Sequence, residues 1–498
     1  MPRNPSETFA DHSEAPNGDS DEQHEALCSY CNVGPAVSTS LAARSMLLAG
    51  AVATVLCACS TTQRYERPSL AGPDDWRNAD QLTPPEWPAV DWWRGFGAAQ
   101  LDTLMLQAQQ HNFDLAAASD RIRQADADVQ IAHAPLFPSV GFDAQWAHGQ
   151  VPARESQALI AASYELDFWG KNRAGAEAAR ATALASRYDR ATIGLSIDSS
   201  VALTYFQALA LHDQINIATN DLASAERLLK ILQARVAAGV SSALDVAQQE
   251  AAVASANARI PPLEAQLQQS TDALALLTGA FPESLDLADG SLADLAAPPI
   301  SAGIPSQLLS RRPDVAEAEA QLVAANANVA VAHAAFLPSV QLTAEGGVAS
   351  VALAHLLSPQ STLFALAAGI TQSIFEGGQL RGQYQKSQAR YDELVQLYRK
   401  AAVSAFADVE DALAGVGHFA EEESRQQRAT AAAQRAYDIS IAQLRAGTID
   451  LITVLTAQNA VFAAEDALVQ AKLAHLQAEV SLYKALGGGW QAQPEVKS

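Results

Sequence analysis

The segment Ala132-His-Ala-Pro-Leu-Phe-Pro-Ser-Val140 recurs 200 residues further along the chain as Ala332-His-Ala-Ala-Phe-Leu-Pro-Ser-Val340. A second pair of segments follows in the same order, because Ala234-Arg-Val-Ala-Ala-Gly239 is matched by Gln443-Leu-Arg-Ala-Gly447. Two matches at similar offsets indicate a duplicated unit of about 200 residues. A unit of this length is too long for a solenoid repeat, so we expect two copies of one larger substructure.

Each copy of the first segment is followed by residues that alternate between apolar and polar. This alternation has period two over about ten residues and occurs four times. We expect strands at about 138–149, 158–168, 338–349 and 363–375. Such strands suit a membrane β-barrel, and they also suit a half-buried soluble sheet, so the pattern alone leaves both readings open.

Long proline-free stretches separate these strands, and they are rich in Ala, Gln, Glu and Arg, which favour helix. We expect helices from about Asn172 to Ala238 and from about Gln379 to Ala446, each on the order of 100 Å long. Glycine can adopt the left-handed conformation that ends a helix, and we expect another helix after Gly239 and after Gly447. The last helix carries apolar residues at the spacing of a coiled-coil seam, namely Val469, Leu473, Leu476, Val480 and Tyr483.

Composition and charge exclude several classes of function. The chain has 498 residues and a formal net charge of −23, which excludes a general nucleic-acid binder. It shows no phosphate-binding glycine loop, no metal-ligand cluster and no catalytic triad, so we expect neither an enzyme nor a metal site. The Cys28-Ser-Tyr-Cys31 pair stands alone in an acidic segment, and we interpret its spacing as chance.

The N-terminal residues read as an export signal. Arg44 precedes the apolar run 46–56, which has the length of a signal-peptide core. The following Leu56-Cys57-Ala58-Cys59 resembles a bacterial lipobox, and a short buried helix is the alternative. We expect residues 1–58 to be a signal peptide with a long polar extension. Cys59 would then carry a diacylglycerol and an N-acyl chain, with no other cofactor, and Ser60 after it implies sorting to the outer membrane.

Four strands cannot close a membrane barrel, because the smallest such barrels have about eight strands. An open sheet edge in lipid would leave unpaired backbone groups that cost several kcal/mol each. If the strands span a membrane, the chain must therefore assemble with copies of itself. Three copies would supply twelve strands and two copies eight, and spacing alone does not choose between them.

Several motifs spread over the chain point to one known family. They are Trp92-Trp93 with Phe96, then Leu101, Leu104, Asn112, Asp114 and Leu115, the segment Tyr164-Glu-Leu-Asp-Phe-Trp-Gly170, the motif Leu308-Leu-Ser-Arg-Arg-Pro-Asp-Val-Ala-Glu-Ala-Glu319 and the ending Ala485-Leu-Gly-Gly-Gly-Trp490. Together they resemble the TolC-like outer membrane factors. The resemblance is strongest to the lipoprotein branch, the NodT-type outer membrane components of tripartite resistance-nodulation-division efflux systems. It covers nearly all of the chain after the lipobox.

The resemblance implies a mostly α-helical fold with a transmembrane β part and an internal duplication. Each chain of a homotrimer would give four strands to a twelve-stranded barrel, and its long antiparallel helices would form a periplasmic α-barrel. The expected divisions are an extended lipid-anchored segment 59–97, a first efflux repeat 98–298, a second repeat 299–490 and a C-terminal tail 491–498.

The implied function is an exit duct in the outer membrane of a Gram-negative bacterium, lipid-anchored and extending into the periplasm. The duct would passively conduct drugs or other toxic small molecules. Its expected partners are a periplasmic adaptor, an inner-membrane pump of the resistance-nodulation-division type and outer-membrane lipids, with no nucleic acid. The alternatives are a duct for protein, aromatic acid or oligosaccharide export, or a coiled-coil lipoprotein without a pore.

The resemblance also implies functional residues at two helical tips, about 235–246 and 445–457. Those matching adaptor-docking positions are Arg235, Gly239, Val240, Arg445, Gly447 and Thr448. The periplasmic gate would use Asp245 and Asp450 with the hydroxyls of Thr453 and Thr456, because some family members carry aspartates where this chain has the two threonines. We expect the Leu-Ser-Arg-Arg-Pro-Asp motif to be structural, capping a helix that begins near Pro313 and pairing with carboxylates.

Overall fold

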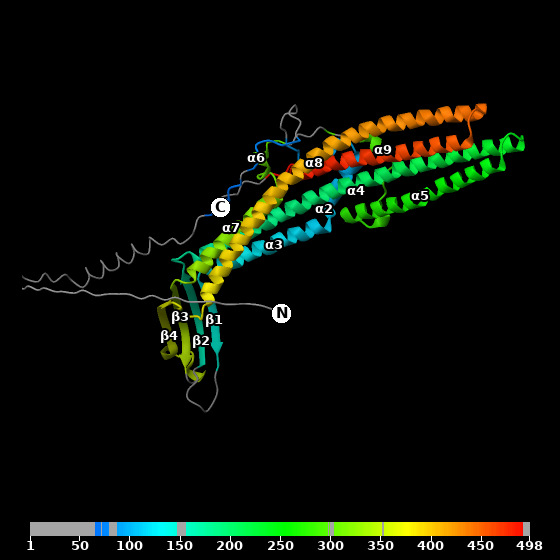
Figure 1. Ribbon diagram of the computed structural model, residues 1–498. Helices are drawn as coiled ribbons and strands as arrows, with labels where there is room; N and C mark the ends of the chain where they lie inside the picture. Colours follow the sequence, from blue (N-terminus) through cyan, green and yellow to red (C-terminus); the bar gives the residue numbers. More distant parts are fainter. Residues whose placement is uncertain are drawn as a thin grey trace, which may run out of the picture. The chain divides into compact units, whose positions relative to one another are not determined.

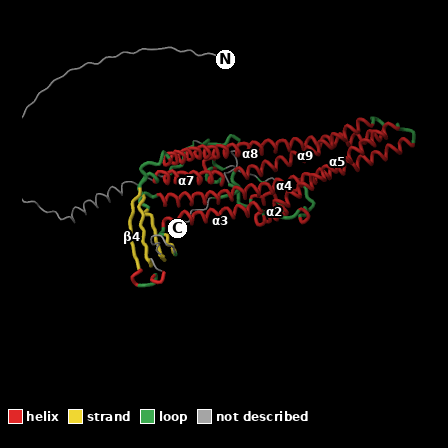
Figure 2. Tube along the Cα trace, turned by 90° about the horizontal axis from the view of Figure 1, so that it is seen from below, coloured by secondary structure: helices red, strands yellow, loops and turns green. Residues whose placement is uncertain are grey.

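The computed structural model describes residues 65–70, 72–78, 87–146, 156–296, 298, 303–350 and 353–491 (Figures 1 and 2). The chain divides into two units, 1–58 and 59–498, and every described residue belongs to the second. The predicted signal peptide, the predicted acylation site Cys59 and residues 492–498 of the predicted tail lie outside the described residues.

Four strands form one antiparallel sheet in the order β1-β2-β3-β4. They are β1 (Ser139–Gln145), β2 (Ser156–Leu166), β3 (Ser339–Ser350) and β4 (Thr362–Thr371). The central pair, β2 with β3, joins the two halves of the chain over the register from Ser156↔Ser350 to Leu166↔Val340. Strands β1 and β4 are the edges, and each has one partner.

The strands end earlier than the alternation suggested, since β2 stops at Leu166 and β4 at Thr371. After β2 the chain turns to begin a helix, and the Asp167 carboxylate accepts the backbone N–H groups of Asn172 and Arg173 at 3.1 and 2.9 Å. The carboxylate thereby satisfies donors that a helix start leaves without partners.

The register carries the alternation of each strand across the whole sheet. Phe142 pairs with Ile160, and Ala344 pairs with Leu366, so apolar side chains share one face. This face is exposed in the single chain, and Phe364, Leu366 and Ile370 are each about three-quarters accessible. The opposite face holds the more polar set, which includes Ser139, Asp143, Gln157, Ser163, Gln341, Thr343 and Glu345.

Helices make up most of the described chain. The α-helices are α2 (Ala99–His111), α3 (Phe113–His133), α4 (Lys171–Ala237), α5 (Ala243–Leu277), α6 (Pro305–Leu308), α7 (Pro313–Ala334), α8 (Gln379–Ala446) and α9 (Leu451–Ala485). Short 3-10 helices lie at η1 (Trp92–Phe96), η2 (Ala134–Leu136), η3 (Pro282–Ser284), η4 (Leu292–Asp294), η5 (Leu353–His355) and η6 (Pro359–Ser361). Within the described residues, no helix combines the length and apolar character needed to cross a membrane.

The two long helices, α4 and α8, connect two differently organised ends of the 59–498 unit. Next to the sheet, α3 packs on α4, α4 on α7 and α7 on α8. Away from the sheet, α5 packs antiparallel to α4, and α9 packs antiparallel to α8 (Figure 1). The prediction of a mostly helical, internally duplicated fold with four strands and long antiparallel helices is confirmed.

Helix α5 continues through Pro261 and Pro262, which lie on its exposed side. Proline inside a helix removes a hydrogen bond and is normally costly. Beyond the prolines the helix still packs, because Leu274 and Ala275 near its end are fully buried. Tertiary contacts on both sides of the prolines therefore maintain a helix that local sequence disfavours.

The largest core surrounds the middle of α4. It joins Trp92 and Phe96 of η1, Phe206 of α4 and the α9 residues Leu476 and Tyr483. Trp92 stacks on Tyr483 with ring centroids 4.8 Å apart. Four residues of the predicted α9 seam, Leu473, Leu476, Val480 and Tyr483, are buried in this core, and Val469 is partly buried against it. The seam thus packs against α4 and the N-terminal residues.

Residues 65–70 and 72–78 contact α7 and α8, and we call them the strap. The Arg67 guanidinium makes two hydrogen bonds of 2.6 Å to the Glu319 carboxylate of α7. The Trp76 indole donates to the Gly303 carbonyl at 3.1 Å and contacts the Phe406 ring of α8. The strap is therefore fixed to both helices by an ion pair and by aromatic packing.

The Arg-Arg-Pro-Asp motif joins three helices. Arg312 pairs with Asp314 at 2.7 Å and with Asp408 of α8 at 2.9 Å, and it donates to the Ala485 carbonyl of α9 at 3.3 Å. The predicted pairing with carboxylates is confirmed. Arg312 occupies the cap position of α7 without a side-chain cap, and Asp314 instead accepts the N–H of Val315 at 3.0 Å.

Candidate functional site

Two turns at the ends of the long helices carry the predicted site residues. Gly239 follows α4 with φ of 73°, and Gly447 follows α8 with φ of 74°, which is the left-handed region that favours glycine. A Cβ atom placed on either residue would meet no other atom of the chain within 4 Å. Glycine is needed there for the backbone conformation, and the space beside it is open.

In the first turn, Ser242 and Asp245 form a capping box at the start of α5. The Ser242 hydroxyl accepts the Asp245 N–H at 3.2 Å, and the Asp245 carboxylate accepts the Ser242 N–H at 2.8 Å. Asp245 also accepts the Ser241 hydroxyl at 2.8 Å. These hydrogen bonds, led by that from the Ser242 backbone, hold the pKa of Asp245 below its usual value, so it is ionised at neutral pH.

In the second turn, Asp450 caps α9. Its carboxylate accepts the Thr453 N–H at 3.0 Å and the Thr453 hydroxyl at 2.6 Å. These two bonds lower the pKa of Asp450, with the hydroxyl as the larger cause. The Thr456 hydroxyl donates to the Ile452 carbonyl at 2.9 Å. Both threonine hydroxyls therefore donate hydrogen bonds within the chain. Of the predicted gate residues in this turn, Asp450 and Thr453 are in direct contact.

A groove of about 570 Å³ lies between α4 and α8, just before the two turns. We call it the tip groove, and its lining residues are Ser224, Arg227, Leu228, Ile231, Arg235, Tyr437, Asp438, Ile441, Leu444 and Arg445. Arg235 donates to the Leu444 carbonyl at 3.2 Å, while its buried Nε has no hydrogen-bond partner. The structure thus brings together Arg235 and Arg445, which sequence reasoning placed at separate tips.

Sequence reasoning missed Arg227. It lies eight positions before Arg235, which is about two helical turns, so the two side chains share one face of α4. The sequence spacing indicates this shared face, but it does not indicate that α8 packs opposite it. Val240, by contrast, lies in the first turn and is 63% exposed, and the Thr448 hydroxyl donates to the Gln443 carbonyl at 3.1 Å.

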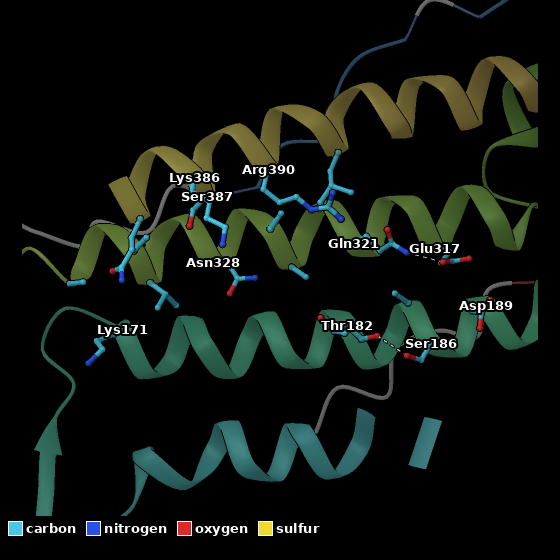
Figure 3. Close-up of a pocket in the computed structure, with 18 residues that line it drawn as sticks. Lys171, Thr182, Ser186, Asp189, Glu317, Gln321, Asn328, Lys386, Ser387 and Arg390 are labelled. Atoms are coloured by element: carbon cyan, nitrogen blue, oxygen red, sulfur yellow. Dashed lines mark hydrogen bonds between the residues drawn. The ribbon is translucent and has the colours of Figure 1, made fainter. Parts of the chain in front are cut away.

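A second cleft, of about 840 Å³, lies among α4, α7 and α8 near the sheet (Figure 3). Its lining includes three basic residues and the two carboxylates Asp189 and Glu317. Two of the basic residues have acidic partners, since Lys171 pairs with Glu165 at 3.3 Å and Arg390 with Glu393 at 2.7 Å. The remaining lining is largely alanine and uncharged polar residues. The cleft therefore mixes basic, acidic and uncharged side chains, and its lining residues form no arrangement for nucleophilic or acid–base catalysis.

A buried ionisable cluster links α8 to α9 away from both grooves. His475 lies 2.7 Å from Glu423 and 3.6 Å from Glu479, and Lys472 lies 3.6 Å from Glu423. Burial raises the pKa of Glu479 to about 8, the positive Lys472 opposes the shift, and Glu423 adds to it. The described residues include no group of three or more His, Cys, Asp or Glu able to hold a metal ion.

The structure thus combines a sheet that has an exposed apolar face with two helices, α4 and α8, of about 100 Å each. A family model described as "Outer membrane efflux protein" matches residues 104–280 and 304–488. The chain belongs to this family. It is an outer-membrane efflux channel protein, as the sequence analysis predicted.

Individual proteins agree with the family. The chain is 41% identical over 454 residues to the pyoverdine export outer membrane protein OpmQ of Pseudomonas aeruginosa, covering 88% of this chain and 95% of that protein. It is 31% identical over 472 residues to the toluene efflux pump outer membrane protein TtgC of Pseudomonas putida, covering 90% and 96%. The solved structure of the outer-membrane channel OprN superposes with a TM-score of 0.82 at 26% identity, covering 87% of this chain and all of that one.

Proposed function

We propose that this efflux protein acts as a homotrimeric, passive exit duct of a tripartite exporter. It receives drugs or other toxic small molecules from an inner-membrane pump, of the resistance-nodulation-division type, through a periplasmic adaptor. The observation that carries the proposal is the amphipathic four-stranded sheet, which has two open edges and lies at one end of helices about 100 Å long.

The open edges support a closed assembly of several chains. In lipid, the free N–H and C=O groups of β1 and β4 need partners, and the edge of a neighbouring copy supplies them. Three copies would give a twelve-stranded barrel. The exposed apolar face with Phe364, Leu366 and Ile370 would then face lipid, and the face with Asp143 and Glu345 would line the pore.

The lipid anchor is the second part of the proposal. Cys59 would carry the diacylglycerol and N-acyl chains, six residues before the first described position. The strap that follows is attached to α7 and α8 through Glu319 and Phe406. An anchor inserted in the periplasmic leaflet would thereby be joined to the outer wall of the helical tube.

The tips are the proposed contact with the adaptor and the proposed gate. Gly239 and Gly447 offer open space to an approaching backbone, and Arg235, Val240, Arg445 and Thr448 lie beside them. Asp245 and Asp450 remain ionised and are the proposed gate carboxylates. The hydroxyls of Thr453 and Thr456 are turned to Asp450 and to the Ile452 carbonyl, so in the gate they would act through these partners.

Substitution at the tips tests this function. We expect the double substitution Gly239→Trp and Gly447→Trp to abolish drug resistance in cells, while the trimer and its level in the outer membrane stay unchanged. The corresponding control is Gly417→Trp, which also has no atom within 4 Å of an added Cβ but lies in the middle of α8. Unchanged resistance in the tip variant would contradict the assignment of the tips as the adaptor-docking site.

A conductance measurement in planar bilayers tests the duct itself. If neither the closed nor the tip-substituted protein conducts ions, the proposal that the protein is a duct is wrong.

A siderophore is a second candidate cargo, favoured by the 41% identity to a protein named for pyoverdine export. The test is to express this chain in Pseudomonas aeruginosa cells that lack OpmQ. Restored secretion of pyoverdine would support a siderophore exporter, and restored resistance to toxic compounds without pyoverdine secretion would support the first candidate.

A further inference from the structure

The cleft among α4, α7 and α8 lies on the side of these helices opposite the strap. On α7, Glu317 lines the cleft and Glu319 binds the strap. Two positions along an α-helix correspond to a rotation of about 200°. On α8, Lys386 lines the cleft and Phe406 contacts the strap, and their separation along the helix also leaves a rotation of about 200° beyond whole turns. The strap and the cleft therefore occupy opposite sides of both helices.

The cleft is continuous with the polar face of the sheet. Lys171, the first residue of α4, lines the cleft and pairs with Glu165 of β2 at 3.3 Å. Glu165 is opposite Gln341 in the register, and it shares a face of the sheet with Thr343 and Glu345. This is the face that would line the pore of the proposed barrel. In that assembly the cleft opens toward the interior of the duct, and the strap lies outside.

Charges of opposite sign lie toward opposite ends of the cleft. Lys171 and Lys386 are nearer the sheet, and Asn328 lies across from Lys386 on α7 (Figure 3). Glu317 and Asp189 are at the end away from the sheet (Figure 3). Asn328 and Glu317 are separated on α7 by about 16 Å along the helix axis. The cleft thus presents positive and negative side chains about 16 Å apart.

Lys386 supplies a positive charge that the described residues do not neutralise. The neighbouring Arg390 does have an acidic partner, Glu393, at 2.7 Å. In the part of the chain that the structure describes, Lys386 has no carboxylate at ion-pair distance, and the side chain of Asn328 has no hydrogen-bond partner. An anionic group at this end would therefore meet a free ammonium group and a free amide donor.

The other end holds two carboxylates that repel each other. Burial raises the pKa of Glu317, and the negative charges of Asp189 and Asp314 raise it further, while the hydrogen bond from Gln321 opposes the shift. Asp189 is partly neutralised by Arg121 of α3 at 3.1 Å, and the Glu317 carboxylate accepts the Gln321 amide at 2.8 Å. A cationic group placed between the two carboxylates would remove their repulsion.

We propose that this cleft is a transit site in the wall of the duct, and that it binds amphoteric small molecules. The anionic group of the cargo would lie at Lys386 and Asn328, and its cationic group at Glu317 and Asp189. A separation of about 16 Å matches about five residues of extended chain. The inference rests on the proposed function and adds a chemical class of cargo. Because the cleft is open and Lys386 is exposed, binding is weak enough to permit release.

A cysteine placed at Lys386 tests whether the cleft lines the passage. Lys386→Cys trimers in planar bilayers are treated with the anionic thiol reagent methanethiosulfonate ethylsulfonate, and we expect a stepwise shift in single-channel conductance. The matched control is Arg399→Cys. Arg399 is exposed and lies seven positions before Phe406, which places it on the strap side of α8. Mass spectrometry confirms that both variants are labelled, and wild-type protein with the same reagent is the blank.

The two possible failures of this measurement have different meanings. An unchanged conductance in labelled Lys386→Cys, or an equal shift in both labelled variants, would overturn the transit site and leave the duct intact. Absence of conductance in both the wild-type and the tip-substituted protein would instead count against the proposed function.

Saturation-transfer NMR on purified trimers tests the chemistry of the ligand. The probe is a capped five-residue peptide with a glutamate, three glycines and a lysine. Two further peptides carry glutamine in place of either the glutamate or the lysine. We expect the amphoteric peptide to bind about fivefold more tightly than either singly charged peptide. Equal affinity for all three peptides, tighter binding of a singly charged one, or no binding of the amphoteric peptide would each overturn the proposal.

Neutral substitutions assign each end of the peptide to one end of the cleft. We expect K386Q and E317Q each to weaken binding of the amphoteric peptide about fivefold. K386Q should leave binding of the cationic peptide unchanged, and E317Q should leave binding of the anionic peptide unchanged. The controls R399Q and D392N remove exposed charges from the strap side of α8, and they should have no effect. Equal losses in the cleft and control variants would contradict binding in the cleft.

Discussion

Asn112 joins α3 to the end of α5 through one side chain. Its carbonyl oxygen accepts the N–H groups of Asp114 and Leu115 at 2.8 and 3.1 Å, which caps α3. Its amide nitrogen donates to the Leu277 carbonyl at the end of α5, at 2.8 Å. The side chain is buried, so water cannot replace these bonds.

We therefore expect Asn112→Ala to lower the free energy of unfolding by about 2 kcal/mol, from the lost cap and the unpaired carbonyl. Asn112→Ser keeps a capping oxygen but cannot reach Leu277, and it should cost about half as much. Circular dichroism melting at fixed protein and detergent concentration measures both, with exposed Gln110→Ala as the control. Equal melting of the alanine and serine variants would contradict the double role.

Glu479 makes stability depend on pH. Its pKa is about 8 in the folded chain and 4.5 in the unfolded one, so the folded chain holds the proton more tightly. Its contribution is complete below pH 4.5 and is lost as the pH rises to about 8. The neighbours that set this balance are Glu423, Lys472, His475 and Tyr483.

Glu479→Gln removes the titrating group and should flatten the loss of stability between pH 5 and pH 8.5. At pH 8.5 we expect the variant to be more stable than the wild type by about 1–2 kcal/mol, because no buried charge has to form. Melting curves across this pH range measure the effect. An unchanged slope would show that other groups cause the dependence.

The sheet can be tested as an element by two neighbouring positions on β4. Leu366 lies on the apolar face opposite Ala344, and Ala367 lies on the other face opposite Thr343. Leu366→Arg would place a charge against lipid at a cost of about 2–4 kcal/mol, whereas Ala367→Arg would face the pore. We expect the first to reduce the amount of trimer in outer-membrane fractions and the second to be tolerated. If Ala367→Arg reduced the amount of trimer and Leu366→Arg did not, the assignment of the lipid-facing and pore-facing sides would be wrong.

Repeats, alternation and helix-ending glycines were sufficient to predict the four strands and the long helices. They could not predict that α5 continues through Pro261 and Pro262, since packing there overrides local preference. Nor could they predict the Arg67–Glu319 pair, whose members are 252 residues apart. Short-range patterns report the conformation of an element, while such contacts depend on how the elements meet.

The candidate site divides in the same way. Gly239 and Gly447 were predictable because the left-handed conformation is a local requirement. The capping bonds of Asp245 and Asp450 also arise within one turn. Arg227 escaped notice because its significance depends on Tyr437 and Arg445, which belong to the other half of the chain. Docking, gating and acylation at the named residues remain predictions.

At the scale of the whole molecule, the duplication makes the two halves similar without making them equal. The sheet pairs one half with the other through β2 and β3, and α9 packs on α4 as well as on α8. Each half therefore completes the core of its partner. Separate expression of residues 98–298 would leave Phe206 without Tyr483 and Leu476, so we expect that fragment to be insoluble or unfolded, as measured by protease digestion.

The connection between β3 and β4 has a consequence for access from outside the cell. Helix α7 leads into β3 at Ser339, and β4 leads into α8 after Thr371, so both helices attach at one end of the sheet. The chain reverses direction at the other end, where Leu357 is 90% exposed. In an assembled duct this reversal would be one part of the described chain that meets the surroundings of the bacterium. A peptide epitope inserted at Leu357 should bind antibody on intact cells, whereas one inserted at Gly447 should bind antibody only after the envelope is opened. The β3–β4 connection would thus be a site that antibodies can reach at the cell surface.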